Sequence, residues 1–210
     1  DAATAADVHP AKNLISIRHL LSHSAGLSYG FVEPDSVIDQ CYLNGGVSGL
    51  GEKDIDLEEL CAGIAKLPLA FEPGTSWRYS FATDVCARLV EVLSGQSFDA
   101  FLRQRIFDPL GMVDTDFWVP QEKAHRLITM YSPEDLFDPM KPGLNKAGDM
   151  ITGPYLARPK MLSGGGGLVS TVADYSAFLR MIINEGEWSG AQLLKPETLK
   201  LMRSNHLADG

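Results

Sequence analysis

The sequence lacks the features that mark two large classes of protein. No apolar run approaches the roughly 20 residues needed to cross a bilayer, so we expect no membrane span. The 27 acidic and 18 basic residues give a net charge of −9 and form no basic cluster, whereas a protein that binds nucleic acid presents a basic face to the phosphates. The 210 residues are 45% hydrophobic, which is enough to bury a sizeable core.

Cysteine is also scarce. The three cysteines, Cys41, Cys61 and Cys86, are odd in number and widely spaced, so they predict neither a disulfide framework nor a zinc pattern. We expect free, mostly buried thiols. Such thiols slightly favour a reducing, cytoplasmic compartment, but the sequence leaves the localisation unknown.

The first residues lack an initiator methionine and the charged-then-apolar pattern of a signal peptide. The opening stretch, DAATAADVHPAKN, is small and polar. We therefore expect the chain to be a processed or truncated piece of a longer protein.

What the sequence does contain is helical periodicity. Apolar residues recur at i, i+3 and i+4 between capping residues and terminal glycines. This pattern predicts six helices, over 16–23, from 56 to about 64, over 82–94, from 97 to about 106, over 172–183 and from 196 to about 206. Strands are expected only over 115–119 and 127–131, with loops at 28–53 and 132–163 and a turn at 187–190. The fold class is therefore mainly α with a few short strands.

Several motifs resemble catalytic sites but lack the required context. His19 and His23 have the spacing of a two-histidine zinc site, but Leu20 stands where a zinc peptidase needs Glu, so we expect no metal and no cofactor. Gly26–Gly30 matches G-x-S-x-G around Ser28, yet a helix precedes the serine where a nucleophile elbow needs a strand. A helix C-cap followed by a turn explains this segment better, and Ser28 stays a reserve candidate.

Four consecutive glycines, 164–167, precede the helix at 172–183. Free backbone N–H groups at such a place can bind an anion, but the Lys-Ser/Thr of a phosphate loop is missing. Close backbone approach and abrupt entry into the helix are the favoured explanation. A role of Gly165 and Gly166 in lining a substrate site remains open.

Tyr79 lies between the turn 72–75 and the next helix, in the segment EPGTSWRYSFATD. A phenol has a pKa near 10, so action as a base at neutral pH needs a shift of roughly 3 units, or about 4 kcal/mol. A neighbouring cation would have to supply it. Arg78 is adjacent, but in an extended segment its side chain points away from Tyr79.

Three segments together resemble the serine β-lactamase-like family of class C β-lactamases, D-alanyl-D-alanine carboxypeptidases and family VIII carboxylesterases. They are ISIRHLLSHSAGL (15–27), EPGTSWRYSFATDVCARLVEVLSGQSFDAFLRQRIFDPLGMVDTDF (72–117) and GGGGLVSTVADYSAFLRMIINEGEWSGAQLLKPETLKLM (164–202). The resemblance implies that Tyr79 matches the family's Y-x-N or Y-S-x motif and relays the proton of a serine nucleophile, which forms an acyl-enzyme.

Two departures from the family pattern are missing motifs. No serine here is followed three residues later by lysine, so the S-x-x-K nucleophile is expected upstream of Asp1. The late K-T-G-like strand is expected beyond Gly210. Residues 1–210 would then be the central, mostly helical part of the α+β β-lactamase/transpeptidase-like fold, with the α/β domain missing on both sides.

A third departure concerns the substrate. Phe81 stands where the β-lactamases carry Asn, so an aromatic-lined site containing Trp77 and Phe81 favours apolar short-chain esters and a carboxylesterase. A β-lactamase or D-alanyl-D-alanine carboxypeptidase is the alternative, and a non-catalytic helical domain, inactive as it stands, is the second. Isolated, the chain would expose the face where the α/β domain docks, and self-association through it is expected.

Overall fold

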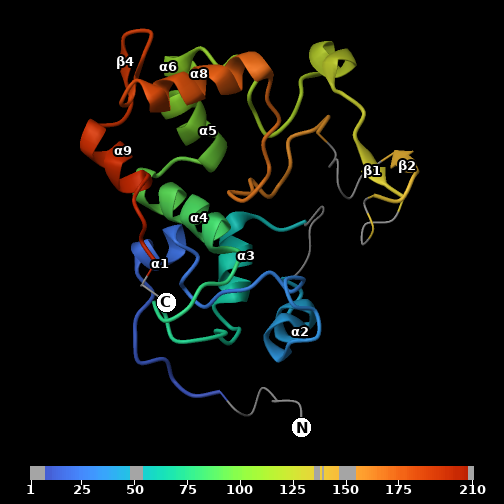
Figure 1. The fold of residues 1–210 in the computed structure, drawn as a ribbon, viewed down its shortest axis with the longest axis vertical. Coiled ribbons are helices and arrows are strands. Elements are labelled where there is room, and N and C mark those ends of the chain that lie inside the picture. Colours follow the sequence, from blue (N-terminus) through green and yellow to red (C-terminus); the bar gives the residue numbers. More distant parts are fainter. Residues whose placement is uncertain (1–7, 48–53, 135–137, 139, 147–154, 208–210) are drawn as a thin grey trace.

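The computed structural model describes residues 8–47, 54–134, 138, 140–146 and 155–207. Helices dominate this part of the chain, as expected (Figure 1). The α-helices are α1 (Ile17–Leu21), α2 (Val37–Asn44), α3 (Leu57–Ile64), α4 (Ala82–Ser94), α5 (Phe98–Leu102), α6 (Asp108–Leu110), α8 (Val172–Ile183) and α9 (Pro196–Met202). A π-helical turn, Arg103–Phe107, joins α5 to α6, and a 3₁₀ helix covers Gln121–Arg126.

All six helices expected from the periodicity are present. Local capping explains several of the boundaries: Asp56 and Glu59 form a capping box at the start of α3, and Gly95 ends α4 in the left-handed conformation at φ +69°. The helix expected from residue 97 continues through the π-helical turn into α6 and ends at Gly111, φ +68°. The last helix, α9, is shorter than expected and ends at Met202 instead of near residue 206.

The sequence predicted a loop over the whole of 28–53, and the structure corrects this prediction. Helix α2 lies within it, with Ser36 as its N-cap accepting a hydrogen bond from the backbone N–H of Asp39. One face of α2 buries Asp39 and Tyr42 completely. The high glycine content of the segment hid this helix, although a serine followed three residues later by an acid is a helix-start pattern. Residues 48–53 lie outside the described part of the chain.

The expected strands are also corrected. Residues 115–119 contribute only an isolated bridge, Asp116 to Val169, because no second strand lies beside them in the described structure. Of 127–131 only Tyr131 is in a strand: β1 (Tyr131–Pro133) pairs antiparallel with β2 (Leu144–Lys146). Of the expected turn at 187–190, residues 187–188 form β3 (Glu187–Trp188), and only 189–190 form the turn that joins it to β4 (Ala191–Gln192) in a hairpin.

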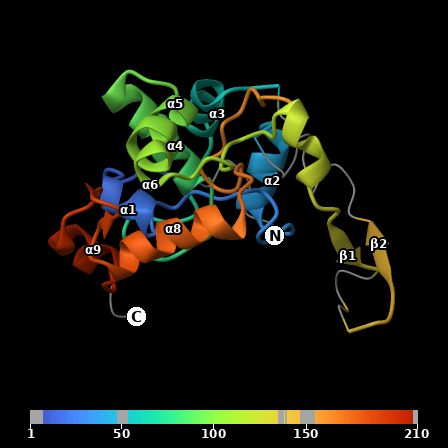
Figure 2. The ribbon, with the colours of Figure 1, turned by 90° about the horizontal axis from the view of Figure 1, so that it is seen from above.

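The core has two parts. The larger cluster joins α1, α3 and α4 to the aromatic side chains Tyr29, Tyr42, Phe81 and Phe117, and the smaller one holds α8 against α6 through Phe107, Leu110, Met112 and Met181. The β1–β2 hairpin projects away from the helices (Figure 2). The loop that carries Tyr79 enters α4 at the larger cluster, so a packed framework supports it.

Candidate active site

The loop that carries Tyr79 is fixed along a second segment, 23–28. Residues 74–81 run beside that segment and donate main-chain hydrogen bonds to it. Three of them are Gly74 N–H to Ser24 O at 2.8 Å, Arg78 N–H to His23 O at 2.9 Å and Phe81 N–H to Ser28 O at 3.3 Å. The arrangement leaves the Tyr79 side chain 43% exposed, on a loop that the framework holds in place.

Tyr79 belongs to a continuous row of rings. Its centroid lies 5.0 Å from that of Tyr29 and 5.2 Å from that of His23. Beyond these, Phe31 stacks on Tyr29 at 5.1 Å, and Trp77 meets His23 edge-on at 6.2 Å. Trp77 is 54% and Phe31 38% exposed, so both ends of the row and Tyr79 offer apolar surface to a ligand.

Phe81 does not belong to this open surface. Its side chain is 2% exposed, with its ring 4.4 Å from that of Tyr29 and 6.5 Å from that of Tyr42. The sequence placed Phe81 in a substrate pocket; the structure places it behind the row, in the core. Phe31 is the exposed aromatic residue that the sequence analysis missed, and its place in the loop after the G-x-S-x-G segment gave no periodic pattern to find it.

Arg78 points to the opposite side from the ring of Tyr79, as the alternation predicted. Its guanidinium donates to Ser28 Oγ at 2.9 Å, to Glu33 Oε2 at 2.7 Å and to Asp39 Oδ1 at 3.0 Å. Asp39 is fully buried. Burial opposes its ionisation, but hydrogen bonds from Ser28, the Glu33 N–H and Arg78 outweigh that effect and hold the pKa of Asp39 below its usual value.

Ser28 is a member of this buried network. It is fully buried, donates to Asp39 and accepts from Arg78. No substrate can reach a hydroxyl in this position, and both of its polar functions are in use. The structure therefore agrees with the explanation of the G-x-S-x-G segment as a turn.

Tyr29 provides a second, buried phenol beside Tyr79. Its hydroxyl lies 3.5 Å from Asp84 Oδ2, and burial, followed by the charge of Asp84, raises its pKa. Asp84 is itself buried and accepts a hydrogen bond from Ser163 Oγ at 2.7 Å. Tyr29 is thus a neutral support for Tyr79 at neutral pH.

The glycines at 164–167 pack against this site, as their number suggested. A Cβ on Gly164 would collide with the carbonyl oxygen of Thr83, and one on Gly165 would lie 2.7 Å from the Tyr29 hydroxyl. Gly166 has nothing within 4 Å of the same position. Close approach therefore explains Gly164 and Gly165, while Gly166 faces open space near the row.

The two histidines that lie four residues apart, His19 and His23, make separate contacts. His19 accepts from the Ser16 backbone N–H at 3.2 Å and caps α1. His23 follows the helix at φ +54° and lies within hydrogen-bonding distance of Ser80 Oγ, at 3.3 Å. In the described parts of the chain, no three His, Cys, Asp or Glu side chains come together as a metal site would need.

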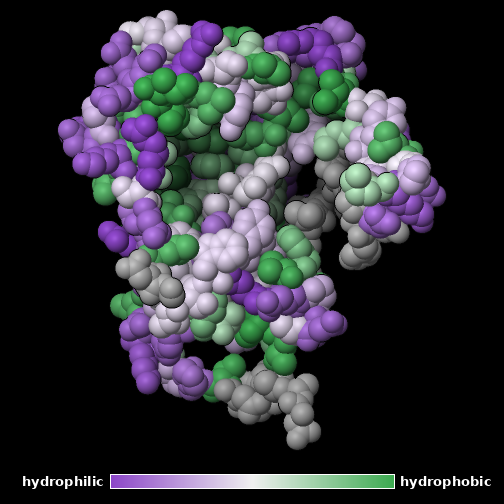
Figure 3. Space-filling model, viewed as in Figure 1, coloured by the Kyte–Doolittle hydropathy of each residue, from purple (hydrophilic) through white to green (hydrophobic). Residues whose placement is uncertain are grey.

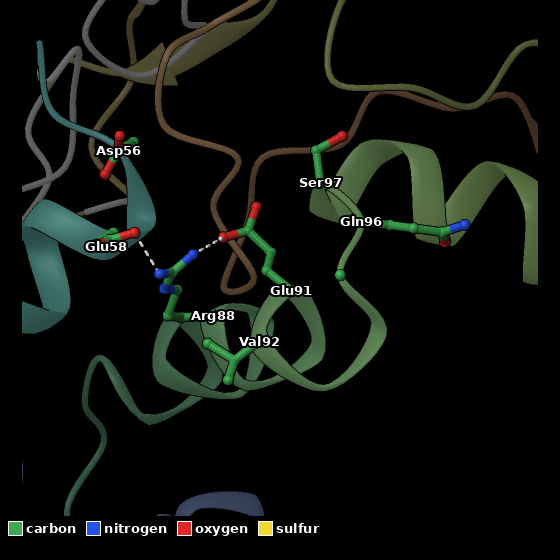
Figure 4. A pocket seen from close by; sticks show the side chains of 8 residues that line it. Asp56, Glu58, Arg88, Glu91, Val92, Gln96 and Ser97 are labelled. Atoms are coloured by element: carbon green, nitrogen blue, oxygen red, sulfur yellow. Dashed lines mark hydrogen bonds and ion pairs between the residues drawn. The ribbon is translucent and has the colours of Figure 1, made fainter.

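A pocket of about 460 Å³ lies elsewhere, between α3, α4 and the start of α5 (Figure 4). Its lining is polar, and Arg88 bridges Glu58 and Glu91 across it. The charged groups satisfy one another, so this pocket is a surface ion-pair cluster distinct from the Tyr79 site.

Comparison with known proteins decides the family. A family model described as Beta-lactamase matches residues 5–209. The chain belongs to the beta-lactamase family. This is a family of serine hydrolases, and it has esterase and acyltransferase members among the relatives of this chain.

Protein Rv1367c of Mycobacterium tuberculosis is 35% identical over 211 residues, covering 100% of this chain and 49% of its own length. Lovastatin esterase of Penicillium rubens is 33% identical over 202 residues, covering 94% of this chain and 46% of the esterase. The solved structure of EstCE1, a hydrolase with promiscuous acyltransferase activity, superimposes with a TM-score of 0.76 at 28% identity, covering 99% of this chain and 54% of that one.

The chain thus spans about half the length of the relatives it matches. The described structure corresponds to the mostly helical portion of the β-lactamase/transpeptidase-like fold.

Proposed function

We propose that this chain is the central part of a serine acyl-hydrolase, specifically a carboxylesterase for short-chain esters, in which Tyr79 accepts the proton of a serine nucleophile upstream of residue 1 and relays it. The observation that carries the proposal is the place of Tyr79. It is partly exposed, on a loop fixed by main-chain hydrogen bonds and flanked by aromatic rings. A general base must be held in such a defined position.

A tyrosine that acts as a base also needs a nearby cation to stabilise its phenolate. Arg78 is not that cation, because its guanidinium is committed to Ser28, Glu33 and Asp39 on the other side of the loop. We infer that the lysine of an upstream S-x-x-K motif supplies the charge. In the resulting reaction, the serine attacks the ester carbonyl, the alcohol leaves with a proton delivered through Tyr79, and water hydrolyses the acyl-enzyme.

The substrate class follows from the surface around Tyr79. Trp77 and Phe31 offer exposed aromatic faces, which favour an apolar acyl or alcohol group. Gly166 leaves space beside Gly165 for the substrate to approach. Two relatives support an ester substrate. One is the lovastatin esterase, and the other is the esterase EstB of Burkholderia gladioli, which is 39% identical over half of this chain.

Two other activities are candidates. A putative D-alanyl-D-alanine carboxypeptidase of Escherichia coli is 24% identical over 219 residues, but the residue two positions after Tyr79 is the buried Phe81, which offers no amide to a peptide or β-lactam. Acyl transfer to an alcohol is favoured by the monacolin J acid methylbutanoyltransferase of Aspergillus terreus, 26% identical over 202 residues.

The test compares hydrolysis of p-nitrophenyl butyrate and of a chromogenic cephalosporin by residues 1–210 and by the full-length protein. We expect only the full-length protein to turn over, with the ester strongly preferred. Added methanol or butanol would reveal transfer as a new ester product. Preference for the cephalosporin would favour the alternative, and activity of residues 1–210 alone would overturn the assignment of the nucleophile to the upstream segment.

A further inference from the structure

The polar network beneath the Tyr79 loop suggests a second role for Arg78. Arg78 and Tyr79 are consecutive residues of an extended segment, so their side chains leave the backbone in opposite directions. The side chain of Arg78 is 12% exposed, and that of its partner Asp39 is fully buried. The inward residue is therefore held far more firmly than the outward one.

The contacts of Arg78 come from three separate parts of the chain. Nε donates to Ser28 in the segment beside the loop, one terminal nitrogen donates to Glu33, and the other donates to Asp39 on α2. Asp39 in turn receives the Ser28 hydroxyl and, at 2.6 Å, the Glu33 backbone N–H. A planar fork with donors in fixed directions can satisfy all three acceptors together, and a lysine ammonium cannot.

We propose that Arg78 is a positioning residue that fixes the place of the Tyr79 ring through Asp39, Ser28 and Glu33. This inference rests on the proposed function for its catalytic consequence, but its structural content is independent of any activity. Rotation of the loop about its axis would move both side chains, so the three anchored contacts on the Arg78 side restrict the phenol on the other side. Ser28 then acts through Arg78 and not on a substrate.

The conservative substitution Arg78→Lys tests the fork while keeping the positive charge beside the buried Asp39, so folding is retained. Arg88→Lys is the matched control, because Arg88 also bridges two carboxylates but lies in the pocket between α3 and α4. The full-length protein is labelled with 3-fluorotyrosine for fluorine NMR. The resonance of Tyr79 is assigned as the one that disappears in Tyr79→Phe. Kinetics use p-nitrophenyl butyrate.

We expect Arg78→Lys to shift and broaden the Tyr79 fluorine resonance and to lower kcat about 10-fold with KM changed less than 3-fold, while Arg88→Lys changes neither. An unchanged resonance, or a kcat equal to that of the control, would overturn the proposal. If Tyr79→Phe itself keeps full activity, the proposed function fails, and the positioning role is then decided by the resonance alone.

Discussion

At the scale of single residues, three side chains of the Tyr79 loop have different surroundings. Tyr79 faces outward in a row of rings, Arg78 faces a buried carboxylate, and Phe81 closes the core behind them. The sequence predicted the directions of Tyr79 and Arg78, because they depend only on neighbouring backbone. It misplaced Phe81, because burial depends on Tyr29 and Tyr42, which come from distant segments.

Truncation of the buried Phe81 gives the first prediction. We expect Phe81→Ala to lower the free energy of unfolding by roughly 3–5 kcal/mol, the usual cost of removing a buried aromatic side chain. Urea unfolding followed by circular dichroism measures it. Trp77→Ala is the control, since Trp77 is more than half exposed and its loss is expected to cost less than about 1 kcal/mol; equal losses would contradict the burial of Phe81.

Asp39 gives a prediction for pH. Its folded-state pKa lies below the usual value, so its contribution to stability is fully present above the unfolded pKa, near 4, and is lost as the pH falls through the lower folded value. We expect the stability of the parent chain to decline across this acidic range more steeply than that of Asp39→Asn. The free energy of unfolding of both proteins is measured by urea titration at a series of acidic pH values. An equal loss of stability with falling pH in the two proteins would contradict the contribution of Asp39.

At the scale of elements, periodicity found six helices, but composition misled where it was the only guide. Helix α2 lies in a glycine-rich segment, and its buried face with Asp39 and Tyr42 is recognisable only against the rest of the core. The strand expected at 115–119 failed for a related reason. A strand needs a partner, and here only Val169 lies opposite, while the side chain of Thr115 and the backbone N–H of Asp114 bind Asp174 of α8.

The glycine loop offers a matched pair of substitutions. Gly164→Ala places a methyl group against the Thr83 carbonyl and 2.8 Å from the Ala87 Cβ, whereas Gly166→Ala meets open space. We expect Gly164→Ala to destabilise the protein by about 1–3 kcal/mol, as overpacking does, and Gly166→Ala to change stability by less than about 1 kcal/mol in either direction. Thermal unfolding of both variants compares them, and a neutral Gly164→Ala would refute the close packing of this loop.

At the scale of the whole molecule, α8 presents an apolar stripe to the outside. Val172, Tyr175, Leu179 and Ile183 are 43–87% exposed, although the opposite face of the helix packs on α6. Figure 3 shows hydrophobic side chains in the upper part of the view, where Figure 1 places α8, and in the hollow below. The sequence predicted an amphipathic helix, but it could not tell which part of the apolar surface the rest of the chain covers.

Such a surface predicts association of the isolated chain. We expect sedimentation velocity of residues 1–210 to show concentration-dependent oligomers, and Val172→Glu with Ile183→Glu to shift them toward monomer. Glu122→Lys, an exposed charged substitution on the 3₁₀ helix and outside this stripe, serves as the control. A monomer at all concentrations would contradict the expectation that the isolated chain associates through its exposed apolar surface.

The most direct test of the central claim is the rate at which an active-site serine probe, a fluorophosphonate, labels the full-length protein with and without Tyr79→Phe. If Tyr79 relays the proton of the nucleophile, the substitution is expected to lower the labelling rate by roughly 10²- to 10³-fold, and mass spectrometry is expected to find the label on a serine upstream of residue 1. An unchanged rate, or a label on Ser28, would contradict the account.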